Sequence, residues 1–186
     1  MCGLIGSGKS TFTADLSDMI GAVSLSEPAG DDRNPYLPMF YEDRVRWAFT
    51  MQVHLLHQRA EVHHRALEEI VGGRDVVMDS SIWQDMAYAD MLYDIGEMSA
   101  NEYDTYKALA RMIDREALRP DVCIFLEVPI SECFARIQHR MTVNTERSCE
   151  SSIDSAYLSK LKSCIKQNIL RLDINVYFPR GDYLPH

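Results

Sequence analysis

The sequence predicts an α/β domain in which a parallel sheet carries helices on both faces. Two observations lead to this fold class. Short apolar segments alternate with longer segments of helical periodicity, and a glycine-rich turn, Gly3–Ser10, comes directly before the first helical segment. At 186 residues, 46% of them hydrophobic, the chain can bury one sizeable core, so residues 1–186 are expected to form a single domain.

The first strand of this sheet is expected to be truncated, because only Met1 and Cys2 precede Gly3 where a buried strand belongs. The glycine-rich turn leads into a helix over Thr11–Ile20. Gly21 ends this helix, since glycine readily adopts the left-handed conformation of a helix C-terminus.

The middle of the chain continues the alternation. A short strand, Ala22–Ser26, is followed by a loop rich in proline, glycine and aspartate. Apolar residues at three- and four-residue steps predict a long helix from about Asp43 to Val71. A strand over Asp75–Asp79 and a helix over Ile82–Ile95 follow. A capping box then opens a helix over about Ser99–Leu118.

The last third contains the most apolar strand, Val122–Leu126, and then a helix through Phe134–Arg140. Residues 141–152 are polar and unpatterned, which predicts a mobile loop. A final helix is expected over about Ile153–Leu172 and a final strand over Ile174–Phe178.

The glycine-rich turn carries the strongest chemical signal. It matches G-x-x-x-x-G-K-[ST], the loop that wraps the phosphates of a nucleoside triphosphate. The glycines let backbone N–H groups turn towards an anion, Lys9 places a cation on the β- and γ-phosphates, and the Ser10 hydroxyl is a Mg²⁺ ligand. The residues expected to hold ATP are Gly3, Gly6, Ser7, Gly8, Lys9, Ser10 and Thr11.

Composition excludes several other classes of protein. A net charge of −9 argues against a protein that grips nucleic acid through its phosphates. Five cysteines without C-x-x-C spacing indicate reduced thiols rather than a disulfide framework or a zinc site. There is no membrane-length apolar run and no signal pattern, so a cytoplasmic protein is expected.

Two acids follow predicted strands, at the edge where parallel sheets bind ligands. Glu27 is a candidate base near the γ-phosphate, and Asp79 is a candidate for positioning magnesium. Either residue could instead be a strand-terminal acid that faces solvent.

With these features in place, the chain resembles the deoxynucleoside kinase family over nearly its whole length. The resemblance implies a P-loop kinase fold with a short arginine-bearing lid at about 140–152. The matching pieces are Gly3–Thr11, Ser26–Pro28, Asn34–Leu37, Tyr41, Trp47–Phe49 with Gln52, Asp79–Ile82 and Arg136–Arg140. The Asn-Pro-Tyr-Leu and Trp-Ala-Phe pieces are most similar to bacterial and phage enzymes that act on purine deoxynucleosides.

The resemblance also implies a role for each acceptor-side residue. Glu27 would accept the proton of the 5′-hydroxyl, and Tyr41 would hydrogen-bond the sugar 3′-hydroxyl. Gln52 would grip the base edge, with Trp47 and Phe49 lining the base.

The resemblance further implies that Arg59 and Asp85 are the Arg/Asp pair that marks family members taking purines or cytosine rather than thymidine alone. On the donor side, Arg136 and Arg140 would neutralise phosphates. Arg140 would act in catalysis with Lys9 and Glu27, and Glu146 would take the lid glutamate's role at the sugar 3′-hydroxyl. Two positions depart from the family, because Ser80 and Thr142 stand where arginines are usual. Arg147 is the candidate substitute for the lid arginine.

The implied reaction is transfer of the ATP γ-phosphoryl group, with Mg²⁺, to the 5′-hydroxyl of a deoxynucleoside, deoxyadenosine or deoxyguanosine. The family also implies a possible homodimer. Two alternatives remain open: a nucleoside monophosphate kinase, and a catalytically weak nucleotide-binding relative, which Ser80 motivates.

Single residues have plainer interpretations as well. Trp47 and Phe49 could simply be core residues of an amphipathic helix, and Gln52 and Arg59 could share a solvated helix face. The histidines of the long helix are read as surface or packing residues rather than metal ligands.

Overall fold

The computed structural model describes residues 1–26, 34–143 and 150–179. Within them the strands are β1 (Cys2–Gly3), β2 (Val23–Leu25), β3 (Val76–Met78), β4 (Val122–Leu126) and β5 (Asn175–Tyr177). The helices are α1 (Lys9–Ile20), α2 (Tyr36–Glu42), α3 (Arg44–Val71), α4 (Ile82–Asp94), α5 (Ala100–Glu116), α6 (Ile130–Val143) and α7 (Ser155–Leu170). The predicted alternation of strands and helices is confirmed.

The strands form two parallel ladders, β2–β3 and β1–β4–β5. The backbone of Met1 joins them. Its ammonium group donates to the Met78 carbonyl at 2.6 Å, and its carbonyl accepts from the Ser80 N–H at 3.0 Å. The described strands therefore follow one another in the order β2-β3-β1-β4-β5, with β1 only two residues long.

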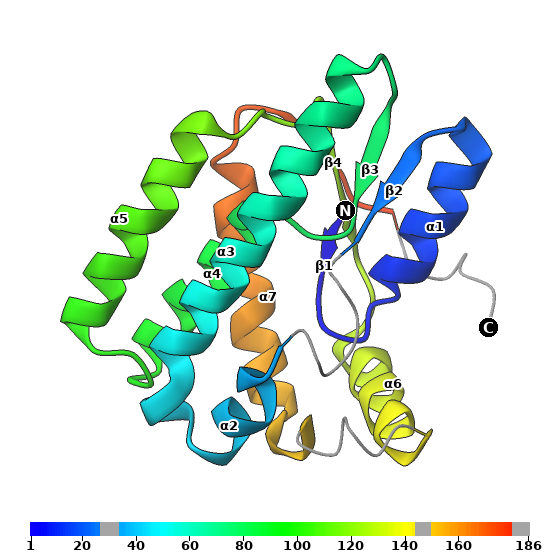
Figure 1. Cartoon of the computed structure of the whole chain (residues 1–186). Coiled ribbons are helices and arrows are strands. Elements are labelled where there is room, and N and C mark those ends of the chain that lie inside the picture. The colour runs from blue at the N-terminus through cyan, green and yellow to red at the C-terminus, as the bar shows by residue number, and fades with distance from the viewer. Residues whose placement is uncertain (27–33, 144–149, 180–186) are drawn as a thin grey trace.

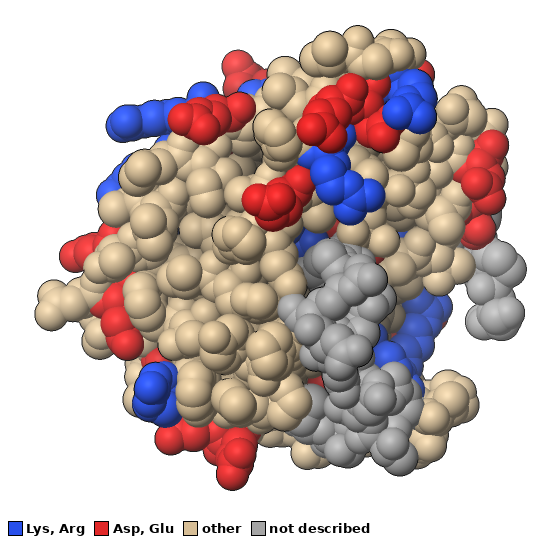
Figure 2. Space-filling model, viewed as in Figure 1, with Lys and Arg blue, Asp and Glu red and all other residues tan. Residues whose placement is uncertain are grey.

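Helices lie on both sides of the sheet, as expected. In Figure 1, α1 lies on one side of β2 and β3, and α3, α4, α5 and α7 lie on the other. The main core is built on α4, which buries Ile82, Ala87, Met91 and Leu92 completely. On the visible face in Figure 2, acidic and basic side chains are interspersed. Of the helices described, none is both long and apolar enough to cross a membrane.

Local sequence signals explain most helix ends. Asp43 accepts from the Arg46 N–H and opens α3, which Gly72 ends. Ser99 and Glu102 form the expected capping box of α5. Two differences stand out. Helix α2 was not predicted, and α6 extends beyond Phe134–Arg140 in both directions. Residues 141–143, which were expected to begin a mobile loop over 141–152, are therefore helical, and residues 150–152 form a 3₁₀ turn. The rest of that predicted loop and lid lies outside the described residues.

Candidate active site

The phosphate loop connects β1 to α1 and reaches the end of the molecule where α2 and α6 lie (Figure 1). Gly6 has φ 76°, and a Cβ there would lie 2.6 Å from the Cys133 carbonyl oxygen of α6, so only glycine fits. Gly8 has φ 88° at the N-cap of α1. The loop backbone is thus pressed against α6, which carries two of the predicted phosphate-binding arginines, Arg136 and Arg140.

The three side chains expected at the triphosphate converge. The Ser10 hydroxyl donates to Asp79 Oδ2 at 2.5 Å, which joins the start of α1 to the end of β3. Lys9 Nζ donates to the Leu4 carbonyl at 2.8 Å within the loop. Desolvation lowers the pKa of Lys9, and the nearby Asp79 carboxylate opposes that change. Lys9 is therefore held in the loop by the Leu4 carbonyl, with the Asp79 carboxylate nearby.

The donor set fits magnesium. Asp79 is 8% exposed, and its Oδ1 atom is buried without a hydrogen-bond partner among the described residues. An unpartnered buried carboxylate oxygen beside a hydroxyl is a pair of hard oxygen ligands of the kind Mg²⁺ takes. Ser10 and Asp79 are therefore the residues that would hold the ion.

The family arginine position is occupied by Ser80, which is buried with φ 68° in the left-handed region. Its Oγ atom accepts a hydrogen bond from Gln84 Nε2 at 3.0 Å. Gln84 Oε1 in turn accepts from the Gly3 N–H at 3.0 Å. The amide of Gln84 therefore ties the start of the phosphate loop to the end of β3, a contact that sequence reasoning did not find.

The acceptor-side residues of α3 face inward. Gln52 is 3% exposed and Arg59 is 4% exposed, so the alternative of a solvated helix face is wrong for both. Arg59 Nε donates to Asp85 Oδ2 at 2.8 Å, and Arg59 Nη1 donates to the Asp79 carbonyl at 3.4 Å. The predicted Arg59–Asp85 pair is thus formed, and it reaches Asp79 at the end of β3.

The aromatic residues expected at the acceptor are partly buried. Trp47 packs against Tyr36 with ring centroids 5.9 Å apart, and Phe49 lies against the main core. Tyr41 packs on Phe40 at 5.2 Å. These three residues stay candidates for the sugar and base.

On α6, Arg136 Nη1 donates to the Ser7 carbonyl at 3.3 Å, and Arg136 also pairs with Glu132. Arg140 Nη2 contacts Glu150 Oε2 at 2.6 Å. The Glu150 carboxylate is 3% exposed, and sequence reasoning did not single it out. Its burial beside a predicted phosphate-binding arginine makes it a candidate for orienting Arg140.

The predictions for Glu27, Glu146 and Arg147 lie outside the described residues. Thr11 is exposed in the first turn of α1, and Thr142 donates to the His139 carbonyl at 2.7 Å near the end of α6. Of the cysteines, Cys2, Cys123, Cys133 and Cys164 are free and buried, which fits the prediction of reduced thiols.

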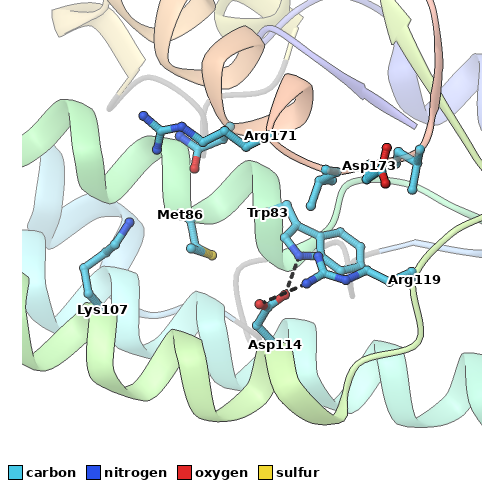
Figure 3. Close-up of a pocket in the computed structure, with 10 residues that line it drawn as sticks. Trp83, Met86, Lys107, Asp114, Arg119, Arg171 and Asp173 are labelled. Carbon is cyan, nitrogen blue, oxygen red and sulfur yellow. Dashed lines mark hydrogen bonds and ion pairs between the residues drawn. The ribbon is translucent and has the colours of Figure 1, made fainter.

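A separate cavity of about 440 Å³ lies between α4, α5 and α7, at the amino end of β5. In Figure 3, Trp83 donates to Asp114, and Arg119 pairs with the same carboxylate. None of the phosphate-loop residues lines this cavity. Ligands of parallel sheets bind at the opposite, carboxyl edge, so the cavity is not the candidate active site.

The glycine loop, Lys9 and the strand-terminal Asp79 together define a phosphate-loop nucleotide-binding fold. A family model described as deoxynucleoside kinase matches residues 1–176, and the chain therefore belongs to the deoxynucleoside kinase family.

Individual relatives agree with this assignment. The chain is 32% identical to a deoxyguanosine kinase of Dictyostelium discoideum over 171 residues, which are 91% of this chain and 58% of that relative. It is 33% identical to a deoxyadenosine/deoxycytidine kinase of Bacillus subtilis (strain 168), over 95% of this chain and 82% of the relative. The chain thus spans a little over half the length of the first of these relatives.

A solved structure of a deoxyadenosine kinase from M. mycoides with bound dCTP has the same fold. The TM-score is 0.79 at 24% identity, with 98% of this chain and 89% of that chain covered.

Proposed function

We propose that the protein transfers the γ-phosphoryl group of ATP to the 5′-hydroxyl of a deoxynucleoside, with deoxyadenosine or deoxyguanosine preferred. The observation that carries the proposal is the meeting of two predicted subsites at the end of β3. Asp79 accepts from Ser10 of the phosphate loop through its side chain, and from Arg59 of the acceptor side through its carbonyl.

The donor side works by positioning and charge neutralisation. Backbone N–H groups of the loop surround the phosphates, and Lys9 supplies a cation that moves from the Leu4 carbonyl to the β- and γ-phosphates. Magnesium on Ser10 and Asp79 would neutralise phosphate oxygens. Arg136 and Arg140 add positive charge from α6, and Glu150 orients Arg140.

The acceptor side selects and aligns the deoxynucleoside. Glu27 is proposed to take the proton of the 5′-hydroxyl as it attacks, and Tyr41 to hydrogen-bond the 3′-hydroxyl. The buried amide of Gln52, whose Oε1 is unpartnered in the described structure, is proposed to read the base edge. The buried Arg59–Asp85 pair is proposed to lie on the acceptor side as well. Glu146 stays a proposed contact of the 3′-hydroxyl.

A panel of the four deoxynucleosides in one phosphorylation assay tests the proposal. ATP consumption should require a deoxynucleoside, and the two purine deoxynucleosides should give the highest kcat/KM. Equal ATPase rates with and without deoxynucleoside would refute the reaction. A preference for deoxynucleoside monophosphates over deoxynucleosides would instead establish a monophosphate kinase.

A catalytically weak relative is the second candidate, and Ser80 is the observation that favours it, since a guanidinium is expected there. A detectable ATP affinity with turnover that stays at background for every acceptor would support this candidate. The homodimer implied by the resemblance and the cytoplasmic location expected from the composition stay part of the proposal. Sedimentation of the purified protein checks the oligomeric state.

A further inference from the structure

Arg44 occupies an unusual place for its charge. It is the first residue of α3, whose first turn has no acidic residue. The positive end of the helix dipole lies there, so a cation in this turn is unfavourable for the helix itself. The Arg44 side chain is nevertheless 16% exposed and fully engaged in tertiary contacts. Its position therefore points to a role beyond α3.

The guanidinium lies among three aromatic rings. Its central carbon is 4.8 Å from the ring centroid of Tyr157, 5.5 Å from that of Tyr41 and 5.8 Å from that of Phe40. Such cation–π contacts hold both the cation and the rings, more strongly where water is excluded. Tyr41, the proposed contact of the sugar 3′-hydroxyl, is thus packed directly on Arg44.

The same guanidinium also forms hydrogen bonds with the segment that leads into α7. Arg44 Nη2 donates to the Ser152 carbonyl at 3.1 Å and to Ser152 Oγ at 2.9 Å, and Arg44 Nη1 pairs with Glu97 at 3.4 Å. Two hydrogen bonds to one residue fix the direction of that residue as well as its distance.

Ser152 is linked to the donor side through a short turn. Residues 150–152 form a 3₁₀ turn, closed by the Ile153 N–H donating to the Glu150 carbonyl at 3.0 Å. The Glu150 carboxylate holds Arg140 at 2.6 Å. A continuous set of contacts therefore runs from Tyr41 through Arg44, Ser152 and Glu150 to Arg140.

From this geometry we propose that Arg44 is a positioning residue that couples the two substrate sites. It sets Tyr41 on the acceptor side against the turn that orients Arg140 on the donor side, so that each bound substrate favours binding of the other. The proposal rests on the proposed function, since it takes Tyr41 and Arg140 as contacts of the deoxynucleoside and of ATP.

Binding of two ligands measures the coupling without turnover. Calorimetry gives the Kd of deoxyguanosine with and without a saturating nonhydrolysable ATP analogue and Mg²⁺. We expect the analogue to tighten deoxyguanosine binding by about tenfold in the wild type, within the usual range of coupling between sites. Arg44→Met should bring this factor close to one.

Three further variants separate positioning from general stability. Arg44→Lys keeps the positive charge but loses the paired N–H donors of the guanidinium, so this variant should keep about half of the wild-type coupling free energy. Ser152→Ala removes one of the two hydrogen bonds and leaves the ring contacts, so its coupling factor should be intermediate. Arg65→Gln removes a cation from an exposed position of the same helix and should match the wild type. Thermal melts of these three variants and of Arg44→Met report any loss of stability.

The outcomes are distinguishable. A variant Arg44→Met that melts lower but keeps the wild-type coupling factor would make Arg44 purely structural and overturn the inference. A wild-type coupling factor below about two would also overturn it. If the ligands bind with coupling but no phosphoryl transfer occurs, the proposed function fails while the positioning role stands.

Discussion

Replacing Gln84 with methionine should weaken the fold at the mouth of the phosphate loop. Gln84 is 2% exposed, and its Oε1 atom accepts from the Gly3 N–H at 3.0 Å. Methionine fills nearly the same volume, so the main loss is the two hydrogen bonds of the amide, with the Gly3 N–H and with Ser80 Oγ, rather than packing. A buried donor left unpaired costs about 1–3 kcal/mol.

The expected loss of unfolding free energy is therefore about 2 kcal/mol. For a chain of this length, that change lowers the Tm by about 4–8 °C. Urea unfolding followed by circular dichroism gives the free energy, and the m-value should stay unchanged. Because Gly3 opens the loop, the Kd for ATP should rise as well. A rise of about tenfold corresponds to a loss of about 1.4 kcal/mol in the free energy of ATP binding.

Gln167→Met is the matched control, because it makes the same chemical change at an exposed position of α7 and should stay within about 0.5 kcal/mol of the wild type. Ser80→Ala removes the partner of Gln84 Nε2, so the double variant should be less destabilised than the sum of the singles. If Gln84→Met is as stable as the Gln167→Met control, the amide does not hold the loop.

Three other outcomes follow from the site. Lys9→Met should lower kcat by at least about 10²-fold while leaving the Tm within a few degrees, which steady-state assays and thermal melts check together. Asp79→Asn should raise the Mg²⁺ concentration for half-maximal activity by about tenfold or more, measured by titration at saturating ATP. Burial, with a smaller contribution from the Arg59 guanidinium, lowers the pKa of His63. As the pH falls, His63 is therefore protonated in the unfolded chain before it is protonated in the folded chain. The unfolding free energy should consequently fall as the pH drops below about 6.5. Comparing urea unfolding at pH 7.5 and 5.5 should show a smaller fall for His63→Leu than for the wild type.

Elements with strong local signals were predictable from the sequence. Helix α5 begins at its capping box, α3 spans nearly the predicted range, and β4 matches the predicted strand. Helix α2 was missed because its seven residues include a proline and follow another proline, which locally indicates a loop. Phe40 of α2 is 4% exposed in the main core, and burying this ring favours the helix over a loop. Tertiary burial decided that segment.

The same contrast between local sequence signals and long-range contacts holds within the candidate site. The pattern around Lys9 and Ser10 is contiguous, so its chemistry could be predicted, and the resemblance supplied the Arg59–Asp85 pair. The contacts of Gln84 and Arg44 could not be predicted. Gly3 and Gln84 are 81 residues apart, and Arg44 and Ser152 are 108 apart. No local pattern marks such pairs, since each side chain alone is compatible with an ordinary helix surface.

Ser80 shows why this distinction matters for experiments on the family arginine. From the sequence, serine there is only a missing guanidinium, and Ser80→Arg is the obvious restoration. In the structure the Ser80 hydroxyl is already the acceptor for Gln84, which holds Gly3. Ser80→Arg therefore adds a charge and removes a hydrogen bond at once, and a comparison with the wild type mixes the two effects. Ser80→Ala loses the same hydrogen bond without adding the charge, so the ratio of kcat between the arginine and alanine variants isolates the guanidinium. A ratio near one would mean that this chain has no use for the family charge at position 80, and a ratio of about 10² or more would mean that its absence limits the rate.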